Sequence, residues 1–400
     1  MRLPPSCFMA MKTWTLVAGL AAILGSGACR ASEGAGAFEE AQALFPLLTS
    51  DVDVEARTLL AFADGACHAG CPDLAVGAIR RIRDWRRGVG AARVADAMMR
   101  TGRVRDAQSL LEEAGRCAND YPNSWQAGLI HARRAAVLVQ LDRTEEARAL
   151  VELLPNDDVA LGRMLFALGL SRVGKVVEAE ALLGEPALAG TGPPAEAQAS
   201  AYAELARHAD DPSRQAMFWR RAIRASIENC DVSEPGALLR EALNCPAAAA
   251  VLREKAPNWL AVAEGRARSL SPMLECKAVM IARLSVCRSV LGDPGVARGL
   301  LEEAASGIES LQRFERPMAL SAVAKGRYLV GDGQRAETLW LDAARQAAGH
   351  QTARLRASGL IAVLLDRISA GSGRSGAISG LVARVAEDHG RDEAVANAMP

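Results

Sequence analysis

The chain has 400 residues, of which 50% are hydrophobic and 24% charged, and its basic and acidic side chains number 47 each. This composition excludes a chain that is disordered throughout, and the zero formal net charge argues against a dedicated nucleic-acid binder, which carries a strongly basic face. Aromatic residues are scarce and alanine is abundant. Alanine favours closely packed helices because it has the highest helix propensity and lets backbones approach.

The N-terminus has the three parts of an export signal. Lys12 precedes an apolar run, TLVAGLAAILG, which is followed by the small residues of SGAC ending at Cys29. A positive start, an apolar stretch and a small-residue cleavage region are typical of a secretory signal peptide. The uncharged stretch is shorter than the roughly 20 residues that span a bilayer. The sequence therefore predicts a cleaved signal over residues 1–28.

The end of this signal resembles a bacterial lipobox. Ser26-Gly27-Ala28-Cys29 has the small residues that precede the lipidated cysteine, although the leucine usual at the third position before it is a serine here. The resemblance implies a lipid anchor on Cys29, with residues 29–37 as a tether. The alternative is ordinary cleavage after Ala28 or Ala31, with Cys29 unmodified.

Residues 38–370 carry a repeated pattern centred on a turn residue, here called position n. Alanine stands at n+5, a large apolar residue at n+8, and a small residue at n−7 except for one glutamate, Glu204. The turn residues are Gly102, Asp142, Gly174, Asp211, Gly292 and Gly331, with a weaker copy at Gly70.

Each copy reads as two amphipathic helices, because apolar and small residues recur at helical spacing on both sides of the turn. One such pair cannot bury its apolar face alone, so the pairs stack. The sequence predicts an all-α, right-handed α-solenoid of stacked antiparallel helix pairs. A Gly- and Pro-rich segment near residues 184–194 divides it into halves, 38–186 and 187–370, and residues 371–400 form a linker and a C-terminal cap helix.

The pattern resembles the tetratricopeptide repeat, in which a small residue, a turn glycine and an alanine follow one another at these spacings. The chain departs from that family in lacking its large aromatic residue early in the first helix. The resemblance implies that the first helices line an inner groove that binds a protein or peptide. The groove positions then include Asp96, Met99, Lys325 and Tyr328.

Cysteines supply the remaining candidate sites. Cys67 and Cys71 flank a predicted turn, and Cys230 and Cys245 could close a hairpin-sized loop, so both pairs are disulfide candidates in an oxidising compartment. The alternatives for the first pair are two packed thiols and metal binding, although the spacing matches neither a zinc nor a haem motif.

The segment GSGRSG at residues 371–376 spells a dinucleotide-binding fingerprint. That fingerprint works only between a strand and a helix, and too few residues follow it to complete such a fold. We interpret it as a linker.

The segment RRIRDWRR at residues 80–87 carries five arginines around Ile82 and Trp85. Read as one helix, it places Ile82 and Trp85 on one side and several arginines opposite. This face could bind phosphates or anionic lipid, or it could be an ordinary solvated surface.

No catalytic, cofactor or metal motif is found in the sequence, so we predict a non-enzymatic protein without a cofactor. The preferred function is an exported scaffold or adaptor, periplasmic or lipid-anchored to the outer membrane, that binds another protein or peptide in a bacterial envelope. Nucleic acid is not expected as a partner, and the membrane is contacted only through the N-terminal anchor. The alternatives are an all-α enzyme acting on an envelope polymer and an uncleaved cytoplasmic regulatory repeat protein.

Overall fold

The computed structural model describes residues 36–49, 51–183, 195–229, 235–271 and 275–398. Within these ranges the chain is helical and forms no strand. The first helices of successive pairs are α3 (Val52–His68), α5 (Arg86–Arg100), α7 (Trp125–Gln140), α9 (Asn156–Arg172), α11 (Ala195–His208), α13 (Pro235–Leu243), α15 (Glu275–Val290), α17 (Arg316–Leu329) and α19 (Ala353–Ala370). The second helices are α4 (Pro72–Arg81), α6 (Val104–Asn119), α8 (Thr144–Glu152), α10 (Val176–Leu183), α12 (Pro212–Asn229), α14 (Pro246–Ser269), α16 (Pro294–Gly307), α18 (Gly333–Ala348) and α20 (Gly376–Ala398).

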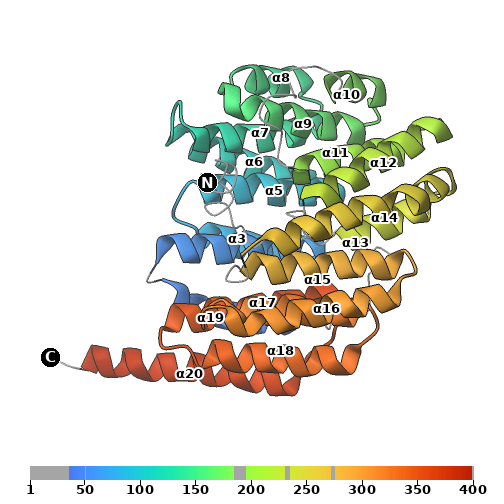
Figure 1. The fold of residues 1–400 in the computed structure, drawn as a ribbon. Coiled ribbons are helices and arrows are strands. Elements are labelled where there is room, and N and C mark those ends of the chain that lie inside the picture. Colours follow the sequence, from blue (N-terminus) through green and yellow to red (C-terminus); the bar gives the residue numbers. More distant parts are fainter. Residues whose placement is uncertain (1–35, 50, 184–194, 230–234, 272–274, 399–400) are drawn as a thin grey trace.

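The helix pairs stack side by side into an all-α solenoid (Figure 1). From α3 to α9, and again from α15 to α19, each first helix packs against the first helix of the next pair. The second helices contact mainly their own partner and the next first helix, with α12 and α14 as an exception. Elements that approach one another lie on the inside of a curve, so the first helices form the concave face and the second helices the convex one.

The predicted turn residues have the backbone conformation that the repeat requires. The turn glycines Gly70, Gly102, Gly174, Gly292 and Gly331 have φ between 75° and 93°, and Asp142 takes the same left-handed region with φ 59°. The alanines at n+5 and the small residues at n−7 are fully buried in most copies. The prediction of stacked helix pairs is confirmed, and the small residues lie where helices touch.

One copy is aligned wrongly by the sequence pattern. The three-residue connection between α11 and α12 is centred on Asp210 rather than Asp211, so the residue at n−7 is the buried Ala203 and not Glu204. Asp211 instead accepts hydrogen bonds from the backbone N–H groups of Ser213 and Arg214 at the start of α12. Two adjacent aspartates hid the register, because either can start a turn.

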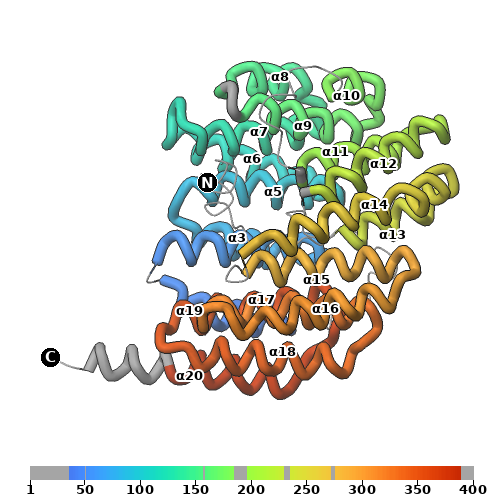
Figure 2. Tube along the Cα trace, in the orientation of Figure 1, coloured from blue at the N-terminus to red at the C-terminus, as the bar shows by residue number. Residues whose placement is uncertain are grey.

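The array closes on itself. Helix α19 packs against α3 and against the 3₁₀ turn η1 (Phe45–Leu48), so the last pair lies beside the first. Arg354 pairs with Asp51 at 2.6 Å across this seam. Leu365 of α19 lies against Gly65 of α3. Figure 2 shows the red C-terminal helices beside the blue N-terminal ones. The solenoid is therefore a ring, in which every pair has two neighbours.

The C-terminal segment behaves as a linker and a cap. Gly371 ends α19 in the left-handed conformation, with φ 77°, and residues 372–375 connect it to α20. The fingerprint-like glycines therefore follow a helix rather than a strand. Helix α20 packs on α18 and α19, and Ser379 donates a hydrogen bond to Glu40 at 2.8 Å.

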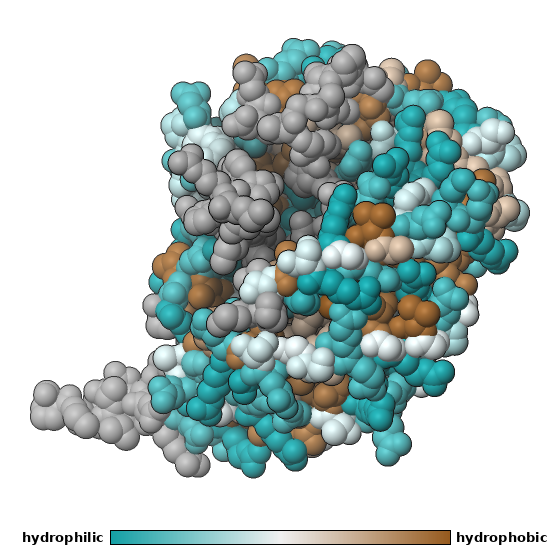
Figure 3. All heavy atoms as spheres, viewed as in Figure 1, coloured by the Kyte–Doolittle hydropathy of each residue, from teal (hydrophilic) through white to brown (hydrophobic). Residues whose placement is uncertain are grey.

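Across the boundary between the two predicted halves, α11 packs directly on α9. The Gly- and Pro-rich segment 184–194 itself lies outside the described residues. In the view of Figure 3 the surface of the ring is a mixture dominated by hydrophilic residues. None of the described helices combines the length and the apolar character needed to cross a bilayer.

The exposed Asp142 offers a simple stability test, because it occupies a backbone region that costs an L-residue free energy and glycine little. Asp142→Gly should raise the free energy of unfolding by about 1 kcal/mol. The matched change Gly102→Ala, at a turn with the same conformation and open space around it, should lower it by about 1 kcal/mol. Urea unfolding measures both variants. A change in the free energy of unfolding with the same sign in both would contradict this explanation.

Candidate functional site: the charged inner face of the ring

Charged side chains gather on the concave face, at three repeat positions of the first helices. Arg93 and Arg133 stand at position n−9, two aspartates at n−6, and two arginines and a glutamine at n−2. These positions lie on one side of each first helix because they are separated by three or four residues and multiples of them. We call the set the inner charged cluster: Asp64, Arg93, Asp96, Arg100, Arg133, Gln140 and Arg172.

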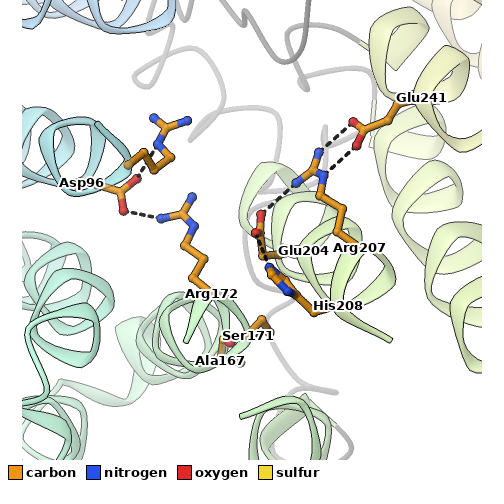
Figure 4. Close-up of polar contacts among 9 residues, drawn as sticks. Asp96, Ala167, Ser171, Arg172, Glu204, Arg207, His208 and Glu241 are labelled. Carbon is orange, nitrogen blue, oxygen red and sulfur yellow. Dashed lines mark hydrogen bonds and ion pairs between the residues drawn. The ribbon is translucent and has the colours of Figure 1, made fainter. Parts of the chain in front are cut away.

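Ion pairs within this cluster join helices that are not neighbours in the sequence. Arg93 of α5 pairs with Asp64 of α3. Arg172 of α9 reaches past α7 to pair with Asp96 of α5, and Figure 4 shows the two side chains pointing toward one another. Gln140 of α7 donates a hydrogen bond to the same carboxylate at 2.9 Å. A contact from α5 to α9 is possible only because the inner face is tightly curved.

Asp96 is held as a carboxylate. Burial by itself would raise its pKa, but the positive charges of Arg172 and Arg100 and the hydrogen bond from Gln140 outweigh burial, and the pKa lies below its ordinary value. A general acid or base working near neutral pH needs a pKa shifted toward 7. Asp96 therefore suits charge pairing rather than proton transfer.

A second inner group joins α11 to α13. Arg207 donates two hydrogen bonds to Glu241, from Nε at 2.6 Å and from a terminal nitrogen at 2.7 Å, and a third to Glu204 at 2.8 Å. His208 contacts Glu204 through Nε2 at 3.2 Å. Such two-pronged arginine–carboxylate contacts are strong and directional. They connect α11 to the short helix α13, where the regular packing of first helices is interrupted (Figure 4).

The histidine and thiol beside the cluster are poor nucleophile candidates. His68 Nδ1 lies 2.6 Å from the carbonyl oxygen of Asp64, and burial lowers its pKa. Burial, with the nearby carboxylate of Asp64, raises the pKa of the Cys67 thiol to about 12. Because the thiolate is the reactive form, this environment suppresses reactivity.

Alkylation tests this environment directly. At pH 8, iodoacetamide should leave Cys67 unmodified in the folded chain and modify it fully in denaturant, because folding stabilises the protonated thiol. Peptide mass spectrometry reads the result. Modification of the folded chain would contradict the raised pKa, and a peptide joined to Cys71 would establish the disulfide candidate. The structure itself has Cys67, Cys71 and Cys245 as free thiols.

An acidic side chain with a shifted pKa lies in the later part of the array. Glu275 at the start of α15 has its pKa raised to about 8, by burial first and then by the charges of Glu315 and Asp366, with Arg283 opposing them. The folded state therefore binds this proton more tightly than the unfolded chain. The resulting stabilisation is complete below pH 4.5 and disappears as the pH rises through 8.

Glu275→Gln removes this titration. The variant should match the parent near pH 4 and should exceed its free energy of unfolding by about 2 kcal/mol at pH 9. Urea unfolding at pH 4, 7 and 9 measures the difference. A difference that does not grow with pH would contradict the raised pKa.

The four groove candidates lie on first helices, but each already has a partner within the chain. Asp96 is paired as described, and Met99 packs half-buried against the core. Lys325 lies 3.8 Å from Asp366. The Tyr328 hydroxyl donates to the carbonyl of Gly371 at 3.4 Å. The structure places them in two pairs, on α5 and α17, and no described contact joins the pairs.

The arginine-rich segment is not one helix. Helix α4 ends at Arg81 and α5 begins at Arg86, so residues 82–85 form the connection between two units. Ile82 is buried under this connection. The prediction of one helix was wrong because the apolar spacing of Ile82 and Trp85 fits a helix equally well. Their side chains instead anchor the connection between two helix pairs.

This connection lies on one edge of the ring, where the half-buried Trp85 and exposed arginines meet the exposed Trp125 of α7. Trp85 and Trp125 meet edge to face at 4.8 Å between ring centroids, and Trp125 is 55% exposed. They stand at the starts of α5 and α7, which share an edge because each helix pair returns the chain to the side where it began. Arg80 and Arg83 are exposed and have no acidic partner among the described residues. We call Arg80, Arg81, Arg83, Trp85 and Trp125 the tryptophan rim.

Other predicted sites lie outside the described residues: the signal over 1–28, the lipidation candidate Cys29, most of the tether, and Cys230. The described residues include no group of three or more His, Cys, Asp or Glu side chains arranged to hold a metal ion.

Comparison with protein-family models, with curated proteins and with solved structures found no match for this chain. The assignment of function therefore depends on the chemistry of the two surfaces described above.

Proposed function

We propose that this protein is an exported scaffold of a bacterial envelope that holds another protein against its tryptophan rim. The observation that carries the proposal is the exposed Trp125, stacked edge to face on the half-buried Trp85, beside arginines without acidic partners among the described residues. Tryptophan and arginine are the side chains that contribute most at protein interfaces, because they bury a large area and donate directional hydrogen bonds. The partner that fits is a protein segment with acidic side chains around an apolar one.

Export is the second part of this proposal, and the N-terminal pattern supports it. Lipidation of Cys29 would add a membrane anchor. Mass spectrometry of the N-terminal peptide of the mature protein tests both. A first residue Cys29 carrying lipid supports an anchored scaffold, and a free N-terminus at residue 29 or 32 supports a periplasmic one. An intact Met1 or Met11 start would point to the cytoplasmic alternative.

Photo-crosslinking in cells tests the rim. A photoreactive amino acid replaces Trp125 in one strain and the exposed Thr338 of the convex helix α18 in a control strain. We expect one discrete adduct at position 125 that disappears in an Arg80→Glu, Arg83→Glu background, with no such adduct at position 338. Equal labelling at both positions, or adducts to lipid alone, would overturn the protein-docking proposal.

The enzyme alternative is less well supported by the inner face. Its carboxylates Asp64 and Asp96 are both held by arginines, and Asp96 has a lowered pKa. This arrangement favours binding of charge over acid–base chemistry.

A further inference from the structure

Arg133 is the one member of the inner charged cluster that breaks the pattern of its neighbours. In the preceding pair, the arginine at n−9 (Arg93) binds the aspartate at n−6 of the helix before it (Asp64). The same rule applied one unit later assigns Asp96 to Arg133. That carboxylate is instead taken by Arg172 and Gln140.

Arg133 is therefore left with a positive charge and no ion-pair partner among the described residues. Its Nε is buried and has no hydrogen-bond acceptor, and the same holds for Nε of Arg93. Burial, and then the positive charge of Arg93, lower the pKa of Arg133 to about 10. Leaving a buried donor without an acceptor costs about 1–3 kcal/mol. Such a group calls for an explanation, and a bound ion that supplies the acceptor is one.

With Arg133 itself included, the group holds four arginines against three carboxylates, a net charge of +1: Arg93, Arg100, Arg133 and Arg172 against Asp64, Asp96 and Glu196. The positive charge of Arg93 acts on Arg133. The nearby carboxylates are already engaged, Asp64 by Arg93 and Asp96 by Arg100 and Arg172. Glu196 of α11 is near enough to act on Arg93 and Arg133 electrostatically, but forms no ion pair with either. The Arg133 side chain is half-buried, so a small molecule can reach it.

We propose that the inner charged cluster is a binding site for a small oxyanion, a phosphate or a carboxylate group, held by Arg133 with Arg93 beside it. Guanidinium groups recognise both ions through paired N–H donors. The ligand supplies a hydrogen-bond acceptor to Arg133 in place of the Asp96 carboxylate, which pairs with Arg172. This site is separate from the tryptophan rim and does not depend on the proposed scaffold function.

If the proposal is right, Arg133 lowers the stability of the ligand-free chain and is required for stabilisation by the anion. Without ligand the charge of Arg133 opposes folding, so Arg133→Gln should raise the melting temperature in Tris–chloride buffer. The same change should abolish stabilisation by the oxyanion. A structural arginine would give the reverse: lower stability, with an unchanged response to anions.

The test is thermal unfolding and calorimetric titration of the purified full chain with sodium phosphate and with sodium succinate, against sodium chloride at equal ionic strength. We expect one of the two to raise the melting temperature by several degrees, and which one does identifies the class of anion. Arg133→Gln should weaken that binding at least tenfold. Glu196→Gln should strengthen it several-fold, because it removes a competing negative charge. The control Arg105→Gln, at an exposed arginine of the convex helix α6, should leave it unchanged.

Two results would overturn the proposal. One is a response to phosphate and succinate no greater than to chloride in the parent chain. The other is an Arg133→Gln variant that binds the anion as the parent does.

Discussion

Replacing Leu365 by alanine should lower the free energy of unfolding by about 3 kcal/mol and should loosen both ends of the chain at once. Leu365 is buried in α19, with its side chain against Gly65 of α3. In an open solenoid each unit is held only by its sequence neighbours. In a ring, the first and last units protect one another, so damage in α19 should be felt in α3.

Hydrogen exchange measures this coupling. The Leu365→Ala variant should exchange faster than the parent in α19 and also in α3, about 300 residues away. The matched control is Leu252→Ala, which makes the same change at a fully buried site in α14, far from the seam. It should lower the free energy of unfolding by a similar amount. It should not make α3 exchange faster relative to the helices beside it. Faster exchange confined to α19 in the Leu365 variant would show that the ring is open in solution.

The Gly169→Ala substitution should destabilise the protein by about 2 kcal/mol, although alanine is the better helix former. A methyl group at this position of α9 would lie 2.7 Å from the carbonyl oxygen of Ala136 and 3.0 Å from its Cα, both backbone atoms of α7. Backbone cannot rotate away as a side chain can, so the two helices must separate. The wider spacing also disturbs the reach of Arg172 to Asp96.

A glycine in open space provides the control. Gly299 lies on the exposed side of α16 with nothing within 4 Å of a methyl group at its position. Gly299→Ala should therefore stabilise the protein by about 1 kcal/mol, which is the gain in helix propensity alone. Urea unfolding of both variants gives the comparison, and stabilisation by Gly169→Ala would refute the close approach of α7 and α9.

Local chemistry explains what could be predicted from the sequence. The turn glycines, the small residues at n−7 and the alanines at n+5 act within one helix pair or between adjacent pairs, so their spacing reveals the stacked architecture. The repeat pattern was hardest to align where two residues of the same type are adjacent, as at Asp210 and Asp211. It also failed at residues 80–87, because a connection between units and a helix can have the same apolar spacing.

Only part of the charged inner face could be predicted from the sequence. Asp96 was predicted from its repeat position, and the arginines at n−9 could have been found in the same way, since Arg93 and Arg133 recur at one position. The sequence could not show that Arg172 would reach Asp96, because that contact spans 76 residues and depends on the curvature of the stack. Arg133 has no ion-pair partner among the described residues because Arg172 and Gln140 engage Asp96 instead.

The sequence by itself determined the class of this protein: an all-α chain of stacked helix pairs, with its turns and close helix contacts placed by glycine, aspartate and alanine. The tertiary structure decided that the array closes, that its first helices bring the inner charged cluster together, and which arginine there has no ion-pair partner among the described residues. Periodicity describes the contacts between neighbouring units, whereas closure depends on the small rotation between units added over the whole array. That sum is a property of all the interfaces together, and no single segment of the sequence contains it.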